Sequence, residues 1–70
     1  MSGWVEDARL ATVEHECPEC GRMARGTGRM RCDALTRRWL VEYRCVDAGF
    51  LAWSEKVEAL TRAVAADHGR

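Results

Sequence analysis

The four cysteines are the residues of this 70-residue chain best suited to chemistry, and two of them form a close pair. Cys17-Pro18-Glu19-Cys20-Gly21 is a C-x2-C sequence. Its spacing lets two thiolates face one metal ion, while the glycine lets the backbone turn sharply behind them. Twenty-four residues separate Cys20 from Cys45, which is enough for a β-hairpin that brings the loops carrying these cysteines together. The spacing therefore indicates a thiolate metal site.

The second half of the pattern is Tyr43-Arg44-Cys45-Val46-Asp47-Ala48-Gly49-Phe50. Over roughly residues 14–54 the chain resembles the zinc-ribbon superfamily, in which a CPxCG knuckle, a hairpin and a second knuckle of the form YRCxxCGxxW hold zinc. It is also faintly similar to phage-type late-gene activators, which carry an arginine-bearing hairpin between their cysteine pairs. The resemblance implies structural Zn²⁺ on Cys17, Cys20 and Cys45, and a nucleic-acid-associated or transcription-related module.

The fourth zinc ligand is the point at which the chain departs from that pattern, because Ala48 stands where the family has cysteine. A closed zinc site needs four ligands. His15 is a candidate, since it lies two residues before Cys17 on the same strand face. Cys32 is the alternative, although a hairpin turning at residues 33–37 places it roughly 20 Å from Cys45. The remaining options are Asp47, His68 and loss of the metal with the ribbon retained.

Other interpretations of the cysteines are weaker. A glutaredoxin-type C-P-x-C needs a helix directly after it, and residues 21–26 are not typical of a helix. An iron–sulfur cluster on all four thiolates is chemically reasonable, but the spacing matches none of the usual cluster patterns. Cys32 and Cys45 are alternatively small buried apolar residues.

Charge is distributed unevenly along a chain that is neutral overall. Residues 1–21 carry a net charge of −4, residues 22–44 carry +5 and residues 45–70 carry −1. The basic middle segment predicts an anion-binding surface for nucleic acid or an acidic protein, and the alternative is a solvated strand surface. The candidate nucleic-acid-binding residues are Arg25, Arg29, Arg31, Arg37 and Arg38.

The elements expected to position these residues are strands followed by one helix. Residues 39–45 alternate with period two, so Trp39, Val41 and Tyr43 share one strand face. We expect further strands at residues 11–16 and 22–32, the second with a bulge near residues 26–28 and a turn at residues 33–37. The prediction is a small α+β fold: a zinc-ribbon-like, three-stranded antiparallel sheet followed by a C-terminal helix over residues 54–68. Residues 1–70 form one domain, with the ribbon over residues 11–53.

Apolar residues outside the alternating strand have two interpretations each. Val57, Leu60 and Val64 form one helical stripe, which either docks on the sheet or pairs with a partner helix or a second copy of the chain as a homodimer. The aromatic residues Trp39, Tyr43 and Trp53 either fill the core or stack nucleic-acid bases. Trp4 and Val5 are either exposed or cover a sheet edge.

Composition narrows the class of protein. The hydrophobic fraction of 47% excludes a disordered chain. The runs of apolar residues are too interrupted to span a membrane, so we expect no membrane partner. The N-terminal residues do not resemble a signal peptide, so we expect a cytoplasmic protein with reduced thiols. The sequence shows neither a catalytic constellation nor a phosphate-binding loop, which indicates a non-enzymatic module. Two functions remain: nucleic-acid association through the basic hairpin, or an adaptor that joins a larger protein complex through the ribbon and helix.

Overall fold

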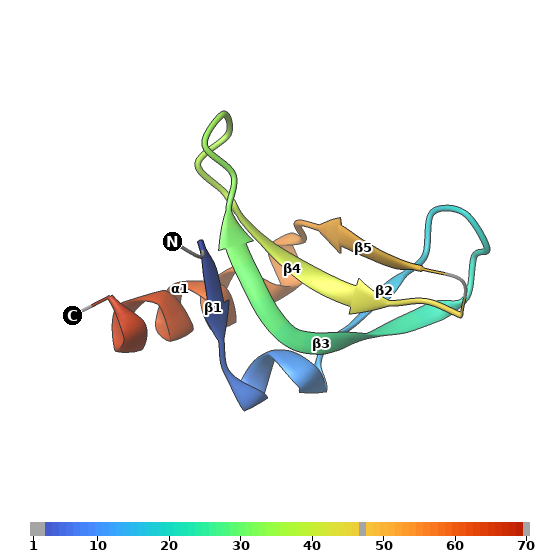
Figure 1. Cartoon of the computed structure of the whole chain (residues 1–70), viewed down its shortest axis with the longest axis horizontal. Coiled ribbons are helices and arrows are strands. Elements are labelled where there is room, and N and C mark those ends of the chain that lie inside the picture. Colours follow the sequence, from blue (N-terminus) through green and yellow to red (C-terminus); the bar gives the residue numbers. More distant parts are fainter. Residues whose placement is uncertain (1–2, 47, 70) are drawn as a thin grey trace.

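A five-stranded antiparallel sheet and a C-terminal helix make up most of the computed structural model, which describes residues 3–46 and 48–69 (Figure 1). The elements in chain order are β1 (Trp4–Glu6), the 3-10 helix η1 (Ala8–Thr12), β2 (Glu14–Glu16), β3 (Met23–Cys32), β4 (Trp39–Arg44), β5 (Gly49–Ala52) and α1 (Glu55–His68). The predicted small α+β class is thereby confirmed. The sheet has five strands rather than the expected three, because β1 and β5 also pair with it.

The long strand β3 is the centre of the sheet (Figure 1). One edge of β3 pairs with β4, which in turn pairs with β5. Its other edge pairs with β2 near residues 23–25 and with β1 near residues 29–31. Trp4 and Val5 therefore cover a sheet edge, which was one of the two roles expected for them. Residues 11 and 12, expected to start a strand, belong to η1 instead.

A bulge bends β3 in its middle, as the glycines predicted. The register with β4 shifts between Gly26 and Met30, and Gly28 has a φ of 95°, which favours glycine. A Cβ atom on Gly26 would overlap the backbone carbonyl oxygen of Leu10. The two glycines thus let β3 turn and let η1 lie directly on the strand.

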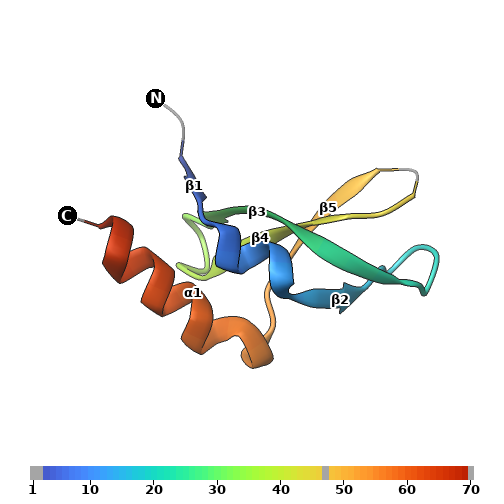
Figure 2. The same cartoon turned by 90° about the horizontal axis from the view of Figure 1, so that it is seen from below.

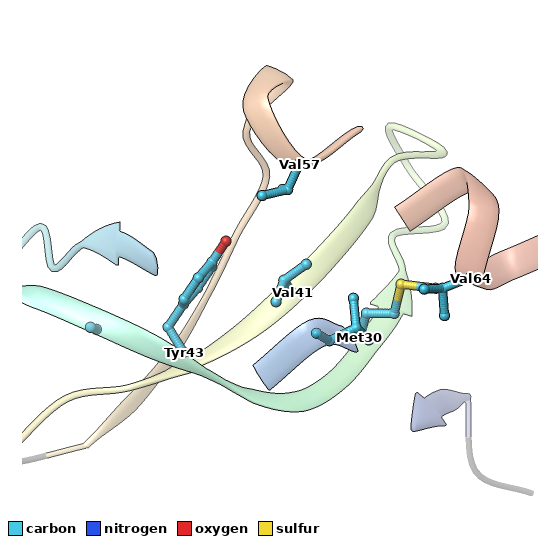
Figure 3. Close-up of a cluster of buried hydrophobic side chains, with 7 residues drawn as sticks. Met30, Val41, Tyr43, Val57 and Val64 are labelled. Atoms are coloured by element: carbon cyan, nitrogen blue, oxygen red, sulfur yellow. The ribbon is translucent and has the colours of Figure 1, made fainter. Parts of the chain in front are cut away.

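The core lies between the sheet and the two helices, and it contains Leu10, Met30, Val41, Tyr43 and Val64, all fully buried (Figure 3). The alternation of β4 places Val41 and Tyr43 on this face, as predicted. Burying an aliphatic side chain of this size contributes about 1.5–3 kcal/mol relative to leaving it in water.

The hydroxyl of Tyr43 points toward Val57 (Figure 3) and has no hydrogen-bond partner among the described residues. Burial raises the pKa of Tyr43, because it disfavours the phenolate. The ring lies against Phe50, with centroids 5.4 Å apart, and supports the cysteine end of the sheet.

The helix α1 begins where the sequence predicts. The Ser54 hydroxyl caps it by accepting a hydrogen bond from the Lys56 N–H at 3.2 Å. Val57 and Val64 are buried in the core and Leu60 packs against it. The helical stripe is therefore used inside the molecule, and a partner that bound these side chains would first have to displace α1 from the sheet.

Candidate metal centre

The loop between β2 and β3 forms a tight knuckle around the first two cysteines. The Cys17 N–H donates to the carbonyl of Arg22, and the Gly21 N–H donates to the carbonyl of Cys17, both at 2.8 Å. Gly21 has a φ of 74°, in the left-handed region that a side chain disfavours. These features return the chain on itself, so Cys17 and Cys20 lie on the same side of the loop.

The knuckle also stabilises a thiolate. Backbone N–H groups of Cys20 and Glu19 donate to the sulfur of Cys17 and lower the pKa of its thiol, with smaller contributions from the thiols of Cys45 and Cys20. Cys17 is 4% exposed, and its burial acts in the opposite direction. Because the thiolate is the metal-binding form of cysteine, this loop favours a ligand at position 17.

The loop between β4 and β5 supplies the third cysteine. The antiparallel pairing of these strands ends at Arg44 and Gly49, and the Cys45 N–H donates to the carbonyl of Ala48 at 3.2 Å. The sulfur atoms of Cys17, Cys20 and Cys45 all lie within 4.8 Å of one another. Sulfur ligands around a tetrahedral zinc ion, with Zn–S bonds of about 2.3 Å, are roughly 3.8 Å apart. The group therefore has the size that a thiolate-bound metal ion requires.

A pocket of about 80 Å³ adjoins the three sulfurs. Besides the three cysteines, it is lined by Pro18, Glu19, Ala48, Gly49 and Phe50. Ala48, at the position where the zinc-ribbon pattern has cysteine, thus lies beside the three-cysteine group. Its methyl group has no atom that binds a metal.

The candidates for the fourth ligand lie at different places. The His15 ring packs 5.3 Å from that of Tyr43, and its Nδ1 is 2.9 Å from the Glu16 carbonyl oxygen. Cys32 pairs with Trp39 at the opposite end of the β3–β4 hairpin. The Nε2 atom of His68, at the end of α1, is 3.0 Å from the Asp7 carboxylate. Asp47 lies outside the described residues. The described group of three contains none of these candidates.

The candidate nucleic-acid-binding arginines are spread along the β3–β4 hairpin. Arg25 lies near the cysteine end, where it is paired in register with Arg44. Arg37 and Arg38 are exposed beside the turn, and Arg37 has a φ of 60°. A hydrogen bond from the Arg37 N–H to the Asp33 carbonyl at 2.7 Å fixes this turn.

Two of these arginines lie close to Trp4, for which the sequence suggested only an exposed position or a place on a sheet edge. The guanidinium groups of Arg29 and Arg31 lie 4.2 Å and 5.6 Å from the ring centroid of Trp4. The strand that carries Trp4 has three residues, which is too short for periodicity to identify.

Comparisons with known proteins leave the site to be interpreted from its own geometry. No family model, no curated protein and no solved structure matches the chain. Within residues 3–46 and 48–69, no helix has both the length and the apolar character needed to cross a membrane. The three-cysteine group identifies the molecule as a candidate small metal-binding module.

Proposed function

We propose that this chain is a small, non-catalytic zinc-binding module, in which the ion ties the knuckle at residues 17–20 to the β4–β5 loop. The convergence of three thiols from two loops on one point carries this proposal. Soft thiolate ligands suit zinc, and the order of knuckle, hairpin and second cysteine loop resembles a zinc ribbon.

The role assigned to zinc is structural. The two loops are joined to the rest of the sheet mainly through β2 and the ends of β3, β4 and β5 (Figure 1). A domain of this size buries only about 60% of its unfolded surface, so a metal cross-link adds stability that the core alone does not supply. The free energy of binding structural zinc is then part of the free energy of folding.

Native mass spectrometry before and after chelation tests the metal site. We expect one zinc ion per chain and loss of ordered structure when it is removed. The variants Cys17→Ser, Cys20→Ser and Cys45→Ser should each weaken zinc binding and reduce the thiolate-to-metal absorption of the cobalt-substituted protein. Cys32→Ser is the matched control and should bind metal normally, because Cys32 lies at the other end of the hairpin. A metal-free protein that unfolds cooperatively at high temperature and does not take up added zinc would contradict the proposal.

Nucleic acid is the proposed partner of the module, contacted by the hairpin arginines. The basic segment carries a net charge of +5, and Arg25, Arg31, Arg37 and Arg38 are exposed on it. The adaptor alternative has less support, since Val57 and Val64 are buried in the molecule's own core.

Salt dependence tests this partner, because phosphate contacts release counterions. Replacing Arg37 and Arg38 together by alanine should reduce the slope of log affinity against log salt by about two. Arg22→Ala, an exposed arginine in the knuckle loop, is the control. Binding that does not change between low and moderate salt would exclude phosphate contacts.

A further inference from the structure

The sheet has one face covered by helices and one that neither described helix covers. Met30, Val41 and Ala52 are aligned by the strand register and point into the core beneath η1 and α1. The helices η1 and α1 contact one another and lie side by side (Figure 2). Side chains alternate along a strand, so the neighbours Arg31 and Leu40 point to the opposite face.

A row of side chains crosses this uncovered face. Trp4 is paired with Arg31, and Arg31 with Leu40. β5 ends at Ala52, which is paired with Val41, so Trp53 directly follows the last paired residue of this edge strand. Both tryptophans are only partly buried.

Arginine accompanies each tryptophan of this row. The guanidinium of Arg29 lies 4.2 Å from the ring centroid of Trp4, and that of Arg38 lies 4.0 Å from the ring centroid of Trp53. Glu42 is an acidic residue on the same face, and its carboxylate already has partners within the chain. Its carboxylate accepts a hydrogen bond from the Thr27 hydroxyl at 2.8 Å and lies 3.4 Å from Nε of Arg29. Glu6, on β1 beside Trp4, is the other acidic group at this end of the face.

A pocket of about 160 Å³ lies at the Trp53 end of the row, between the β3–β4 turn and α1. Arg37, Arg38 and Arg62 line it together with Trp53, Trp39 and Thr61, so α1 forms one wall of the pocket and the row ends at the edge of the uncovered face. Glu58 also lines it, but its carboxylate forms an ion pair with Arg62 at 2.8 Å. Guanidinium groups beside an indole ring suit a phosphate next to a base.

We propose that this uncovered sheet face binds single-stranded nucleic acid, with bases stacking on Trp4 and Trp53 and phosphates contacting Arg31, Arg37 and Arg38. The inference rests on the proposed function and specifies its partner. A sheet face with separated aromatic rings needs unpaired bases, because the bases of a duplex are stacked on one another. Of the aromatic residues that the sequence suggested for stacking, only Trp53 is retained, since Tyr43 is fully buried and Trp39 packs against the core.

Fluorescence anisotropy of a labelled oligothymidylate of about 12 nucleotides, compared with a duplex of equal length, tests the proposal on the zinc-loaded chain. We expect the single strand to bind at least about tenfold more tightly than the duplex. Trp4→Ala and Trp53→Ala should each weaken binding by roughly 5- to 150-fold, which corresponds to the loss of one base–aromatic stacking contact. Arg31→Ala should weaken binding and lower the salt slope by about one.

Matched variants separate loss of stacking from loss of folding. Trp4→Phe and Trp53→Phe retain a ring and should bind within about threefold of the unmodified protein. Arg22→Ala removes an exposed arginine from the far end of the molecule and should change binding least. The absorption of cobalt at the three cysteines should be the same in every variant, because none of the substituted residues belongs to the metal-ligand group.

Each contrary outcome has a distinct meaning. The uncovered face is not a stacking surface if both tryptophan-to-alanine variants bind as tightly as the unmodified protein, or if the duplex binds as tightly as the single strand. Neither result would contradict the proposed metal module or its arginine contacts. Displacement of the oligonucleotide by polyglutamate of equal charge would show a general anion surface and would overturn the inference. If neither nucleic acid binds at low salt, both the inference and the proposed partner fail.

Discussion

The Sγ atoms of Cys20 and Cys45 lie 3.2 Å apart, although 25 positions separate the two residues in the chain. A disulfide bond is about 2.05 Å long, so these two sulfur atoms are in close contact without being joined by a disulfide. The two loops that carry them are held by backbone hydrogen bonds of their own. A metal ion and a disulfide would therefore compete for the same two sulfur atoms.

Oxidation of the metal-free protein with diamide should form a Cys20–Cys45 disulfide. The two thiols lose two protons and two electrons, which reduce the azo group of diamide to a hydrazine. Bound zinc should protect both sulfurs, because their electron pairs are engaged by the ion. Peptide mapping by mass spectrometry identifies the linked cysteines. A disulfide that includes Cys32 as the main product would contradict the arrangement.

The substitution Ala48→Cys should tighten zinc binding by roughly tenfold or more, since it adds a fourth thiolate beside the existing three. Competition with a chromogenic chelator measures the change. Ala52→Cys, in β5, is the control, because Ala52 packs against the core and not against the cysteine group. Equal zinc affinity for Ala48→Cys and the unmodified chain would show that position 48 does not face the ion.

Gly26→Ala should destabilise the fold by about 1–3 kcal/mol, the usual cost of forcing extra atoms into a packed site. The new Cβ would overlap the Leu10 carbonyl oxygen and approach the Val13 side chain at 3.2 Å, so η1 would have to move away from β3. Urea denaturation measures the free energy of unfolding. Gly3→Ala is the matched control, since a Cβ there meets nothing within 4 Å. Equal destabilisation by both variants would argue against the close contact of η1 with the bulge.

Tyr43→Phe should leave the free energy of unfolding unchanged or raise it by up to about 1–3 kcal/mol. The reason is that the buried hydroxyl has no partner among the described residues, and phenylalanine removes its desolvation cost. Tyr43→Ala, which also removes the buried ring, should lose about 3–5 kcal/mol. Thermal and chemical denaturation compare the two variants. A clear loss of stability in Tyr43→Phe would indicate that the hydroxyl is hydrogen-bonded in solution.

Asp7 should make the stability of the protein depend on pH below about 4. Hydrogen bonds from the Arg9 side chain, the Arg9 backbone N–H and His68 lower the pKa of this carboxyl well below its unfolded value of about 3.9. A lowered folded-state pKa contributes stability that is present above the unfolded pKa and is lost as pH falls toward the folded pKa. Melting temperature should therefore fall as the solution is acidified from about pH 4.

Asp7→Asn isolates the charge from the helix cap, because asparagine retains an oxygen that accepts the Arg9 N–H. The variant should melt at a lower temperature at pH 7 and should show a weaker acid dependence. Asp67→Asn is the control: it contacts the same guanidinium, but its side chain is 61% exposed against 13% for Asp7, so its effect should be smaller. The reverse order of effects would refute the assignment.

Periodicity was sufficient to predict the elements that bury one continuous stripe. The alternation over residues 39–45 gives β4, and Val57, Leu60 and Val64 with the Ser54 cap give α1. The bulge followed from the glycines. Strands β1 and β5 were missed because they have three and four residues, which do not complete a recognisable period, and because β3 selects them by pairing. Residues 11 and 12 were assigned to a strand, but η1 occupies that segment because it packs on Gly26.

The candidate site was predictable in part. Spacing and the resemblance to a zinc ribbon together suggested that Cys17, Cys20 and Cys45 converge, and the structure brings their sulfurs together. The place of Cys32 at the far end of the hairpin also followed from counting residues along the strands. The arginine–tryptophan row did not follow, since Trp4 and Trp53 meet their arginines only through pairing of β1 and β5.

The bend in β3 has a consequence for how the two ends of the molecule are oriented. On one side of the bulge β3 carries β2 and leads to the knuckle, and on the other it carries β1 and Trp4. Between Gly26 and Met30, the shift in register against β4 accompanies a fixed bend in β3. The angle of this bend sets the direction in which the tryptophan row faces relative to the sulfur atoms of the three-cysteine group. The direction of a nucleic-acid strand bound along the row, relative to the cysteine loops, would therefore depend on the bend that contains Gly28.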